Sequence, residues 1–229
     1  MAIKKAYLSL YLDSPLQSWG YQSRFDRRTS LSFPTRSGIF GMICAAMGIE
    51  RENNSFLKEI ADIRMTVFAF LQNGRLIDFH TVGGGFDPKT ERHWMVRKAN
   101  RSKPDTVVTR REYLQYSRFG AILEGQSDTL QKMADALENP RWGIWLGRKS
   151  CIPASPVCHG LFPDEDAALN RLIKASCATE IRRVVREAKT FEEGTDTIMD
   201  IPLDFSKRRF SPRRIAVKTQ TEINYDADF

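Results

Sequence analysis

Histidine and cysteine are scarce in this chain of 229 residues, which contains three and four of them respectively. None of the three histidines (His80, His93 and His159) lies in a metalloprotease, HxH or kinase-like motif. The cysteines show no C-x-x-C spacing, and Cys151, Cys158 and His159 lack the fourth ligand and the spacing of a zinc site. We therefore expect no metal and no other cofactor.

Long apolar runs are also missing. No stretch approaches the roughly 20 residues that a membrane-spanning helix needs. The apolar segment from Ala6 to Leu10 is too short for a signal peptide and is not followed by a cleavage site. We expect a cytoplasmic protein that makes no contact with a membrane.

The usual catalytic loops are absent as well. The chain has no Walker loop and no G-x-S-x-G elbow, and no helical pattern follows the run Gly83–Gly85, so it is not a dinucleotide fingerprint. A metal-free ribonuclease stays open, because it needs only an acid or base near a 2′-hydroxyl. His80, His93, Lys103 and Tyr113 lie close enough in sequence to form such a set.

Positive charge is in excess. Lysine and arginine number 35 against 28 acidic residues, which gives a formal charge of +7 and a pI of about 9.3. The runs Arg182–Arg183, Lys207–Arg209 and Arg213–Arg214 concentrate this charge. A polyanion is therefore a reasonable partner.

The stretch from Ser32 to Gly48 predicts a helix. Pro34 suits its first turn, Thr35 or Ser32 suits its N-cap, and Gly48 suits a left-handed C-cap. Apolar residues recur at steps of three and four and predict a core face made of Ile39, Met42, Ile43, Ala46 and Met47.

A second stripe of the same helix, formed by Gly38, Gly41 and Ala45, has almost no side chains. Such a stripe indicates close approach of another backbone. Arg36 and Ser37 stand at the helix start, where free N–H groups favour an anion. Two interpretations remain open: a phosphate chain crosses this end of the helix, or the helix packs tightly in the core and Arg36 is merely solvated.

The remaining pattern predicts an α+β fold. The expected strands are 3–12, 63–71, 75–82, 119–123 and 142–146, and a helix is expected at 127–138 with Leu130, Met133, Ala134 and Leu137 buried. Asn73–Gly74 is a strong hairpin signal. Together with the helix at 32–48, this order is that of a ferredoxin-like unit. A helix at 166–175 and strands at 179–188, 198–205 and 214–219 follow.

The stretch from Phe86 to Val108 interrupts this pattern with many cations and few apolar residues. A loop of this length inside a domain is unusual, so we expect a protruding arm, hinged on Gly83–Gly85. Trp94 and Met95 near its middle would wedge between stacked bases. The alternative is a solvated loop.

Two further loops carry candidate contacts. Trp19 and Gly20 follow the first strand, and the tryptophan is either a stacking platform for a base or a core plug. Gly147, Arg148, Lys149 and Ser150 follow an expected strand and suit a phosphate or sugar, although a solvated turn has the same composition.

Four blocks together resemble a known family. The blocks Ser14–Gly20, Phe33–Gly38, Arg111–Leu114 and Leu146–Cys151 occur in the order found in the CasD family, the type I-E members of the CRISPR-associated RAMP proteins. The resemblance spans residue 3 to about residue 155, and beyond Ala154 no motif matches.

The resemblance implies a modified ferredoxin-like (RRM-related) domain over residues 1–150, with a long protruding thumb at about 83–108. A β-rich C-terminal extension over 151–229 would pack on the same domain. The resemblance further implies a subunit of the Cascade antiviral surveillance complex, which binds the 5′ handle of the CRISPR RNA. Its neighbours would be the backbone subunit CasC and the large subunit CasA, and it would meet target DNA only indirectly.

The resemblance also bears on catalysis. Type I-C relatives process precursor CRISPR RNA with a Tyr-Lys-His set in which Lys and His are adjacent, and this chain has no Lys-His dipeptide. We expect a subunit that is not an enzyme, with a metal-independent endoribonuclease as the alternative. The expected RNA-binding residues are Gln17, Trp19, Gly20, Arg24, Arg27, Arg36, Ser37, Gly38, Arg110, Arg148, Lys149 and Ser150. The expected thumb residues are Arg92, Trp94, Met95, Arg97 and Lys98.

Overall fold

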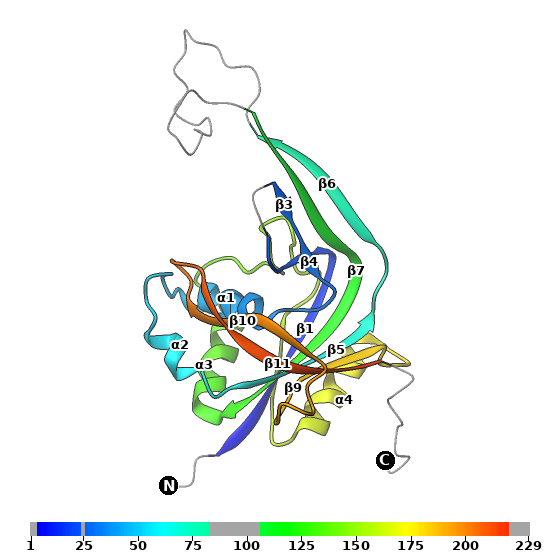
Figure 1. Cartoon of the computed structure of the whole chain (residues 1–229). Coiled ribbons are helices and arrows are strands. Elements are labelled where there is room, and N and C mark those ends of the chain that lie inside the picture. The colour runs from blue at the N-terminus through cyan, green and yellow to red at the C-terminus, as the bar shows by residue number, and fades with distance from the viewer. Residues whose placement is uncertain (1–3, 24–25, 83–105, 220–229) are drawn as a thin grey trace.

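A large, mainly antiparallel sheet organises the protein, whose computed structural model describes residues 4–23, 26–82 and 106–219 (Figure 1). Seven strands follow the order β10–β11–β9–β5–β7–β1–β8, and β3 and β6 also pair with β7. The bounds are β1 Lys5–Gln17, β3 Arg27–Arg28, β5 Arg64–Leu71, β6 Arg75–Val82, β7 Val107–Gln126, β8 Cys158–Phe162, β9 Arg183–Glu187, β10 Asp196–Asp204 and β11 Arg209–Thr219. A separate pair joins β2 (Trp19–Gly20) to β4 (Ser30–Leu31).

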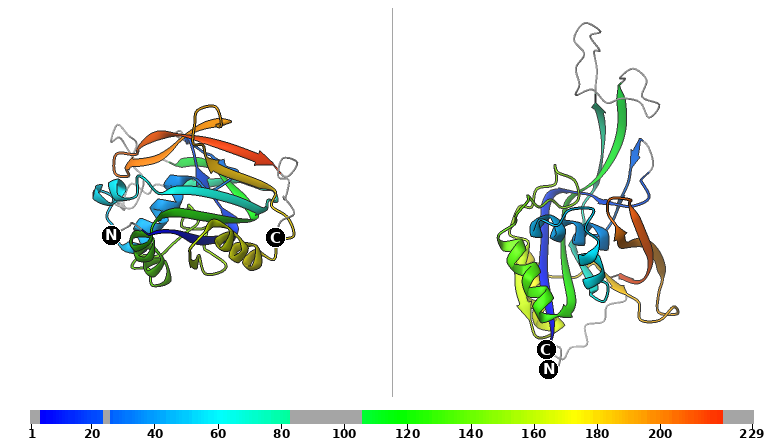
Figure 2. Two further views of the ribbon diagram at one scale, coloured as in Figure 1. Left: turned by 90° about the horizontal axis from the view of Figure 1, so that it is seen from below. Right: turned by 90° about the vertical axis from the view of Figure 1, so that its left-hand side faces the viewer.

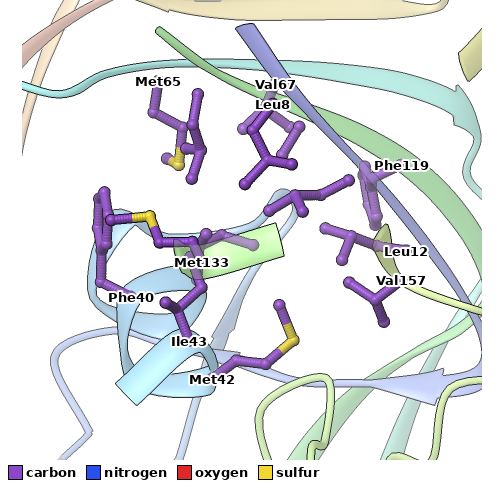
Figure 3. Close-up of a cluster of buried hydrophobic side chains, with 14 of the residues drawn as sticks. Leu8, Leu12, Phe40, Met42, Ile43, Met65, Val67, Phe119, Met133 and Val157 are labelled. Carbon is purple, nitrogen blue, oxygen red and sulfur yellow. The ribbon is translucent and has the colours of Figure 1, made fainter. Parts of the chain in front are cut away.

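Helices cover both faces of this sheet. The helices are α1 Arg36–Met47, α2 Ser55–Glu59, α3 Ser127–Glu138 and α4 Glu165–Ser176. Alternate residues of β1 enter two different cores, because successive side chains of a strand point to opposite faces. Leu8, Leu10 and Leu12 share one core with α1 and α3, whereas Tyr11 shares the other with α4. Figure 3 shows the first core, where Phe40, Met42 and Ile43 of α1 face side chains from the strands.

The predicted caps of α1, Thr35 and Gly48, are confirmed, whereas Pro34 lies before the N-cap and not in the first turn of the helix. The hydroxyl of Thr35 accepts a hydrogen bond from the N–H of Gly38, and Gly48 is left-handed with φ 69°. Its predicted core face is buried except for Met47, which is half-buried. Helix α3 has the predicted bounds and the four predicted buried residues, although its N-cap is Gln126, which makes no side-chain capping bond.

The predicted hairpin at Asn73–Gly74 is wrong. Strand β6 pairs with β7 and not with β5, and Leu71 lies opposite Arg118 while Arg75 lies opposite Leu114. The reason is the 20-residue length of β7, which offers the same edge first to β5 and then to β6. The turn therefore carries the chain along that edge instead of back upon itself.

Two other strand predictions need correction. The first strand does not end before Asp13 but continues through Pro15 to Gln17, and the short strand expected at 119–123 is one part of β7. The strand expected at 142–146 is absent, and β8 occupies the edge of β1 instead. The helix expected at 166–175 and the three expected C-terminal strands are present as α4, β9, β10 and β11, with shifted ends.

Strand β6 and the first half of β7 leave the body of the protein as a two-stranded ribbon (Figures 1 and 2). The ribbon runs as far as the pair Val82 and Val107. The expected hinge Gly83–Gly85 and the expected thumb residues Arg92, Trp94, Met95, Arg97 and Lys98 lie outside the described residues, as do His93 and Lys103.

Candidate nucleic-acid interface

A groove runs along α1, from Ser37 in its first turn to the residues that follow Gly48. It consists of two adjoining hollows of about 540 and 320 Å³, which share Ser37, Gly38, Gly147, Phe205 and Phe210 as lining residues. We call it the α1 groove. Its floor is α1, one wall is the loop 142–150, and the other wall is the turn between β10 and β11.

Gly147 fixes the 142–150 wall against the end of β1. Its φ is +104°, and a Cβ atom there would lie 1.7 Å from the carbonyl oxygen of Ser18. The N–H of Ser18 donates to the carbonyl of Leu146 at 3.1 Å. Only glycine allows this approach, so two sequence blocks that are far apart in the chain meet here.

Arg148 ties the same wall to β7 and β3. Its guanidinium donates to the carbonyls of Glu112 (2.8 Å) and Arg28 (2.7 Å) and lies 4.6 Å from the ring centre of Tyr113. Arg148 therefore contributes positive charge to the groove from a fixed position. Lys149 is exposed, with its Nζ atom 5.7 Å from the ring of Trp145.

Of the two interpretations of Trp19, the structure supports the core plug and not the stacking platform for a base. The side chain is 0 % exposed, and its Nε1 donates to Oε1 of Gln17 at 3.1 Å. Gln17 is equally buried and donates to the carbonyls of Leu12 and Ser117. A Cβ atom at Gly38 would lie 2.8 Å from the Trp19 ring, so the missing side chain at Gly38 makes room for this ring and not for another backbone.

Arg36 is also buried, at 1 % exposure, so neither a phosphate contact nor a solvated side chain describes it. Its backbone N–H donates to Oδ2 of Asp200 at 2.7 Å, and its guanidinium donates to the carbonyls of Ile60 (2.9 Å) and Ile63. Burial lowers the pKa of Arg36, and the carboxylate of Glu187, 3.6 Å away, counteracts this. The start of α1 favours an anion, and the protein itself supplies one in the carboxylate of Asp200.

Arg213 holds that anion in place. Its Nε and Nη2 atoms donate to the two carboxylate oxygens of Asp200 at 2.8 and 2.7 Å, and both side chains are buried. The pair connects β10 and β11 to the first residue of α1. Sequence reasoning missed Asp200 and Arg213, because no local pattern marks a partner more than 150 residues away.

Asp204 shapes the wall formed by the β10–β11 turn. Its carboxylate accepts hydrogen bonds from the N–H of Lys207 and the hydroxyl of Ser206, both at 2.9 Å, and lies 3.3 Å from the guanidinium of Arg209. These contacts, the Lys207 N–H foremost, lower the pKa of Asp204 to about 2. The turn presents Phe205, Arg208 and Phe210 to the groove.

Comparison with known proteins now identifies the family. Residues 7–216 match the family described as CRISPR-associated protein (Cas_Cas5). The chain belongs to this family. It is 31 % identical over 170 residues to the CRISPR system Cascade subunit CasD of Escherichia coli (strain K12), an alignment that covers 69 % of this chain and 70 % of the relative. The family resemblance carried by the four sequence blocks is thereby confirmed.

Solved structures agree with the fold. A chain in a structure described as a CRISPR RNA-guided surveillance complex superposes with a TM-score of 0.76 at 29 % identity, over 93 % of this chain and 90 % of that one. A structure described as the crystal structure of a Cas protein superposes with a TM-score of 0.63 at 28 % identity, over 93 % and 94 %. The predicted α+β class is confirmed, and the structure adds that its sheet is large and mainly antiparallel.

The predicted RNA-binding residues of this Cas_Cas5 protein fall into groups. Gly20, Ser37, Gly38, Arg148 and Lys149 line the α1 groove. The side chains of Gln17, Trp19 and Arg36 are buried and line neither hollow, so the structure offers them no surface in the groove. The hydroxyl of Ser150 lies 3.4 Å from that of Tyr113, outside both hollows. Arg24 lies outside the described residues.

Arg27 and Arg110 form a separate group at the ribbon, where they pair with each other across β3 and β7. Both are exposed, and Arg110 lies 3.3 Å from Asp26 and 5.5 Å from the ring centre of Phe79.

Sequence reasoning missed the aromatic lining of the groove. Trp142, Trp145, Phe205 and Phe210 all line it, and a phenylalanine stands near each end of the basic run Lys207–Arg209. That interleaving of aromatic and basic residues was the available signal, because it is typical of single-strand binding.

The ribonuclease candidates do not come together in the part of the chain that is described. His80 lies opposite Thr109, four residues along β7 from Tyr113, which corresponds to about 13 Å of strand. Tyr113 is buried beneath Arg148.

Burial raises the pKa of Cys44, which lines the groove, to about 11, so this thiol stays protonated at neutral pH.

Residues 4–23, 26–82 and 106–219 contain neither a metal-binding cluster nor a membrane-spanning helix. No group of three or more histidine, cysteine, aspartate and glutamate side chains there is arranged to hold a metal ion. No helix within these ranges is long and apolar enough to cross a membrane.

Proposed function

We propose that this protein is a non-catalytic subunit that binds the 5′ handle of the CRISPR RNA in a type I-E Cascade antiviral complex. Family membership and the name of the E. coli relative support the setting. The observation that carries the proposal is the α1 groove, where residues from three of the four sequence blocks line a single surface.

The chemistry of the groove suits a single RNA strand. Its cations are Arg28, Arg51, Arg148, Lys149 and Arg208, and its aromatic residues stand among them. Cations that follow a backbone and aromatic rings that stack on bases together bind single strands. The small residues Ser37 and Gly41 on the exposed side of α1 let a strand lie close to the helix.

The fold supports a ferredoxin-like unit at the centre of this subunit. The chain order β1–α1–β5–β7–α3–β8, with β8–β1–β7–β5 across the sheet, has the βαββαβ arrangement that such a unit requires. We place its end after Phe162, later than residue 150, because β8 supplies its last strand. Strands β9 to β11 then form the C-terminal extension.

Neighbouring subunits are part of the same proposal. The ribbon exposes Ile77 and Phe79, which are 63 % and 61 % exposed, and apolar surface of this kind indicates a protein contact. CasC would lie against this ribbon and against the thumb at about 83–108, and CasA would lie nearby. The assembled complex would act in the cytoplasm and reach target DNA through the guide RNA.

A binding experiment tests the proposal. The full chain is titrated with an RNA of the repeat-derived 5′ end and with a scrambled RNA, and we expect a preference for the first. The double variant Lys149→Ala, Arg208→Ala should weaken binding and its salt dependence. Its matched control removes two cations from α4 on the other face of the sheet, Arg171→Ala and Lys174→Ala, and should bind as the unmodified chain does.

Equal affinity for the two RNAs, or an equal loss of affinity in both double variants, would refute the proposal that the α1 groove binds this RNA specifically. Incubation of purified protein with repeat RNA in the absence of metal addresses the endoribonuclease alternative. Site-specific cleavage that persists through further purification would replace the non-catalytic proposal.

A further inference from the structure

The two ends of the α1 groove differ in chemistry. Ser18, Ser23 and Thr35 give the smaller hollow short polar side chains, and Arg28 and Arg148 give it positive charge. The larger hollow is lined by Trp142, Trp145, Met42 and Ile49. Phe205 and Phe210 line both hollows and so stand where they meet. A strand that follows the groove therefore passes from a polar channel into an aromatic one.

The aromatic end is an apolar hollow that no part of the described chain fills. Its volume of about 540 Å³ is within the range of sites that hold small organic ligands. Trp142 is 42 % exposed, although an indole ring of this kind is usually mostly buried. A flat apolar group entering the hollow would cover this surface.

The charges around the hollow indicate what that flat group is attached to. Lys149 lies beside Trp145, and Arg208 and Arg51 line the same hollow. Glu50 is the one carboxylate among its lining residues, and its neighbour in sequence is Arg51. An aromatic slot with several cations at its margin suits a nucleobase whose flanking phosphates bind those cations.

We infer that the aromatic end of the α1 groove is a pocket for one unstacked nucleobase of the bound RNA. The inference rests on the proposed function and makes it more specific. It requires that one base leave the stack and enter the space beside Gly41, while the strand on one side of it continues through the polar hollow. Recognition then depends on a single unpaired nucleotide as well as on overall charge.

Gly41 allows the pocket to be closed without harm to the helix. A Cβ atom at this position would meet its nearest atoms, on the Phe205 ring, at 3.8 Å, which is ordinary contact. Gly41→Ala is therefore accommodated, whereas the longer side chain of Gly41→Leu must extend into the hollow. Both changes favour the helical state of α1, because glycine is a poor residue in a helix interior.

The experiment uses the full chain and two series of RNAs with the repeat-derived 5′ sequence. In one series each nucleotide in turn is 2-aminopurine, and in the other each is abasic. We expect one position at which fluorescence changes on binding and at which the abasic substitution weakens binding about tenfold, as stacking of one base on aromatic side chains predicts. Gly41→Leu should abolish both effects and bind intact RNA about tenfold more weakly, while the control Arg171→Ala with Lys174→Ala, on the other face of the sheet, should match the unmodified chain.

Thermal unfolding measures whether both variants are folded, and we expect cooperative transitions for both. If no position is sensitive, while Lys149→Ala with Arg208→Ala still weakens binding, the base pocket is wrong and the proposed function stands. If Gly41→Leu retains the sensitive position, that base binds elsewhere and the inference is equally wrong. If the full chain does not prefer the repeat-derived RNA at all, both the inference and the proposed function fail.

Discussion

Arg36 is the first residue of α1, and its surroundings leave no room for an RNA phosphate. Its guanidinium is held by backbone carbonyls and lies near Glu187, and its N–H is bound to Asp200. Removal of one partner from a buried ionic cluster typically costs about 3–5 kcal/mol, because the remaining charge is left unpaired. We expect Arg36→Ala to lower the free energy of unfolding by this order, as measured by urea denaturation.

RNA affinity of the folded Arg36→Ala protein should depend on salt as that of the unmodified chain does. Lys149→Ala is the matched control and should behave in the opposite way. Its unfolding should be unchanged, and its slope of log K against log salt should fall by about one unit. A flattened salt slope with unaltered stability in Arg36→Ala would mean that this guanidinium contacts RNA after all.

The carboxylate of Asp204, in the β10–β11 wall, makes the stability of the folded protein depend on pH. Its pKa is about 2 in the folded protein, against an ordinary value of 3.8, because the Lys207 N–H, the Ser206 hydroxyl and Arg209 stabilise the ionised form. The stabilisation is fully present above the unfolded pKa and is lost as the pH falls from about 4 to about 2.

Asp204→Asn keeps the shape of this side chain and removes its charge. We expect a lower melting temperature than that of the unmodified protein at pH 7, and a difference that narrows below about pH 4. Circular dichroism melts across this range measure both. A difference that stays constant down to pH 2 would contradict the assigned role of the carboxylate.

At the scale of elements, the limits of sequence reasoning follow from where the determinants lie. The caps of α1 and the buried face of α3 depend on residues a few positions apart, so local spacing was sufficient to predict them. The partner of β6 was not predictable in this way. Asn73–Gly74 favours a hairpin locally, but the long edge of β7 outweighs that preference, because its pairings are chosen by the whole sheet.

The same distinction explains the site. Gly20, Ser37, Gly38 and the 147–149 run were predictable because the blocks that carry them have a distinctive composition. The burial of Trp19 and Arg36 was not, because it depends on Gln17, Gly38 and Asp200 being placed around them. Phe205 and Phe210 enter the groove only because β10 and β11 bring the C-terminal part of the chain to α1.

The ribbon can be tested as an element. Val82 and Val107 are paired, so an Asn-Gly turn that joins them replaces residues 83–106 without a change of register. We expect this shortened chain to fold and to bind the repeat-derived RNA through the α1 groove. Because it lacks the proposed thumb, it should assemble poorly with CasC, which co-purification with a tagged CasC measures.

A shortened chain that assembles as well as the full one would show that residues 83–106 are not needed for assembly. Double substitution of the exposed ribbon residues, Ile77→Thr and Phe79→Thr, provides a milder variant. It should change the free energy of unfolding by no more than about 0.5 kcal/mol, as is usual for surface changes, and still weaken assembly with CasC.

At the scale of the whole molecule, one sheet divides the protein into two sides. The side of α1 carries the groove, and its walls come from the 142–150 loop and from the β10–β11 turn. The other side is covered by α4 over its own core. The buried pair of Asp200 and Arg213 attaches the C-terminal strands to α1, so the groove depends on both parts of the chain.

Photo-crosslinking of the assembled complex can show whether the guide RNA lies in the α1 groove. A guide RNA with 4-thiouridine in its repeat-derived 5′ end is irradiated, and the crosslinked peptides of this subunit are identified by mass spectrometry. We expect crosslinks in residues 142–150 and 205–210, and their loss in Gly41→Leu at the nucleotide that enters the pocket. Crosslinks confined to α4, or to surfaces away from α1, would contradict it.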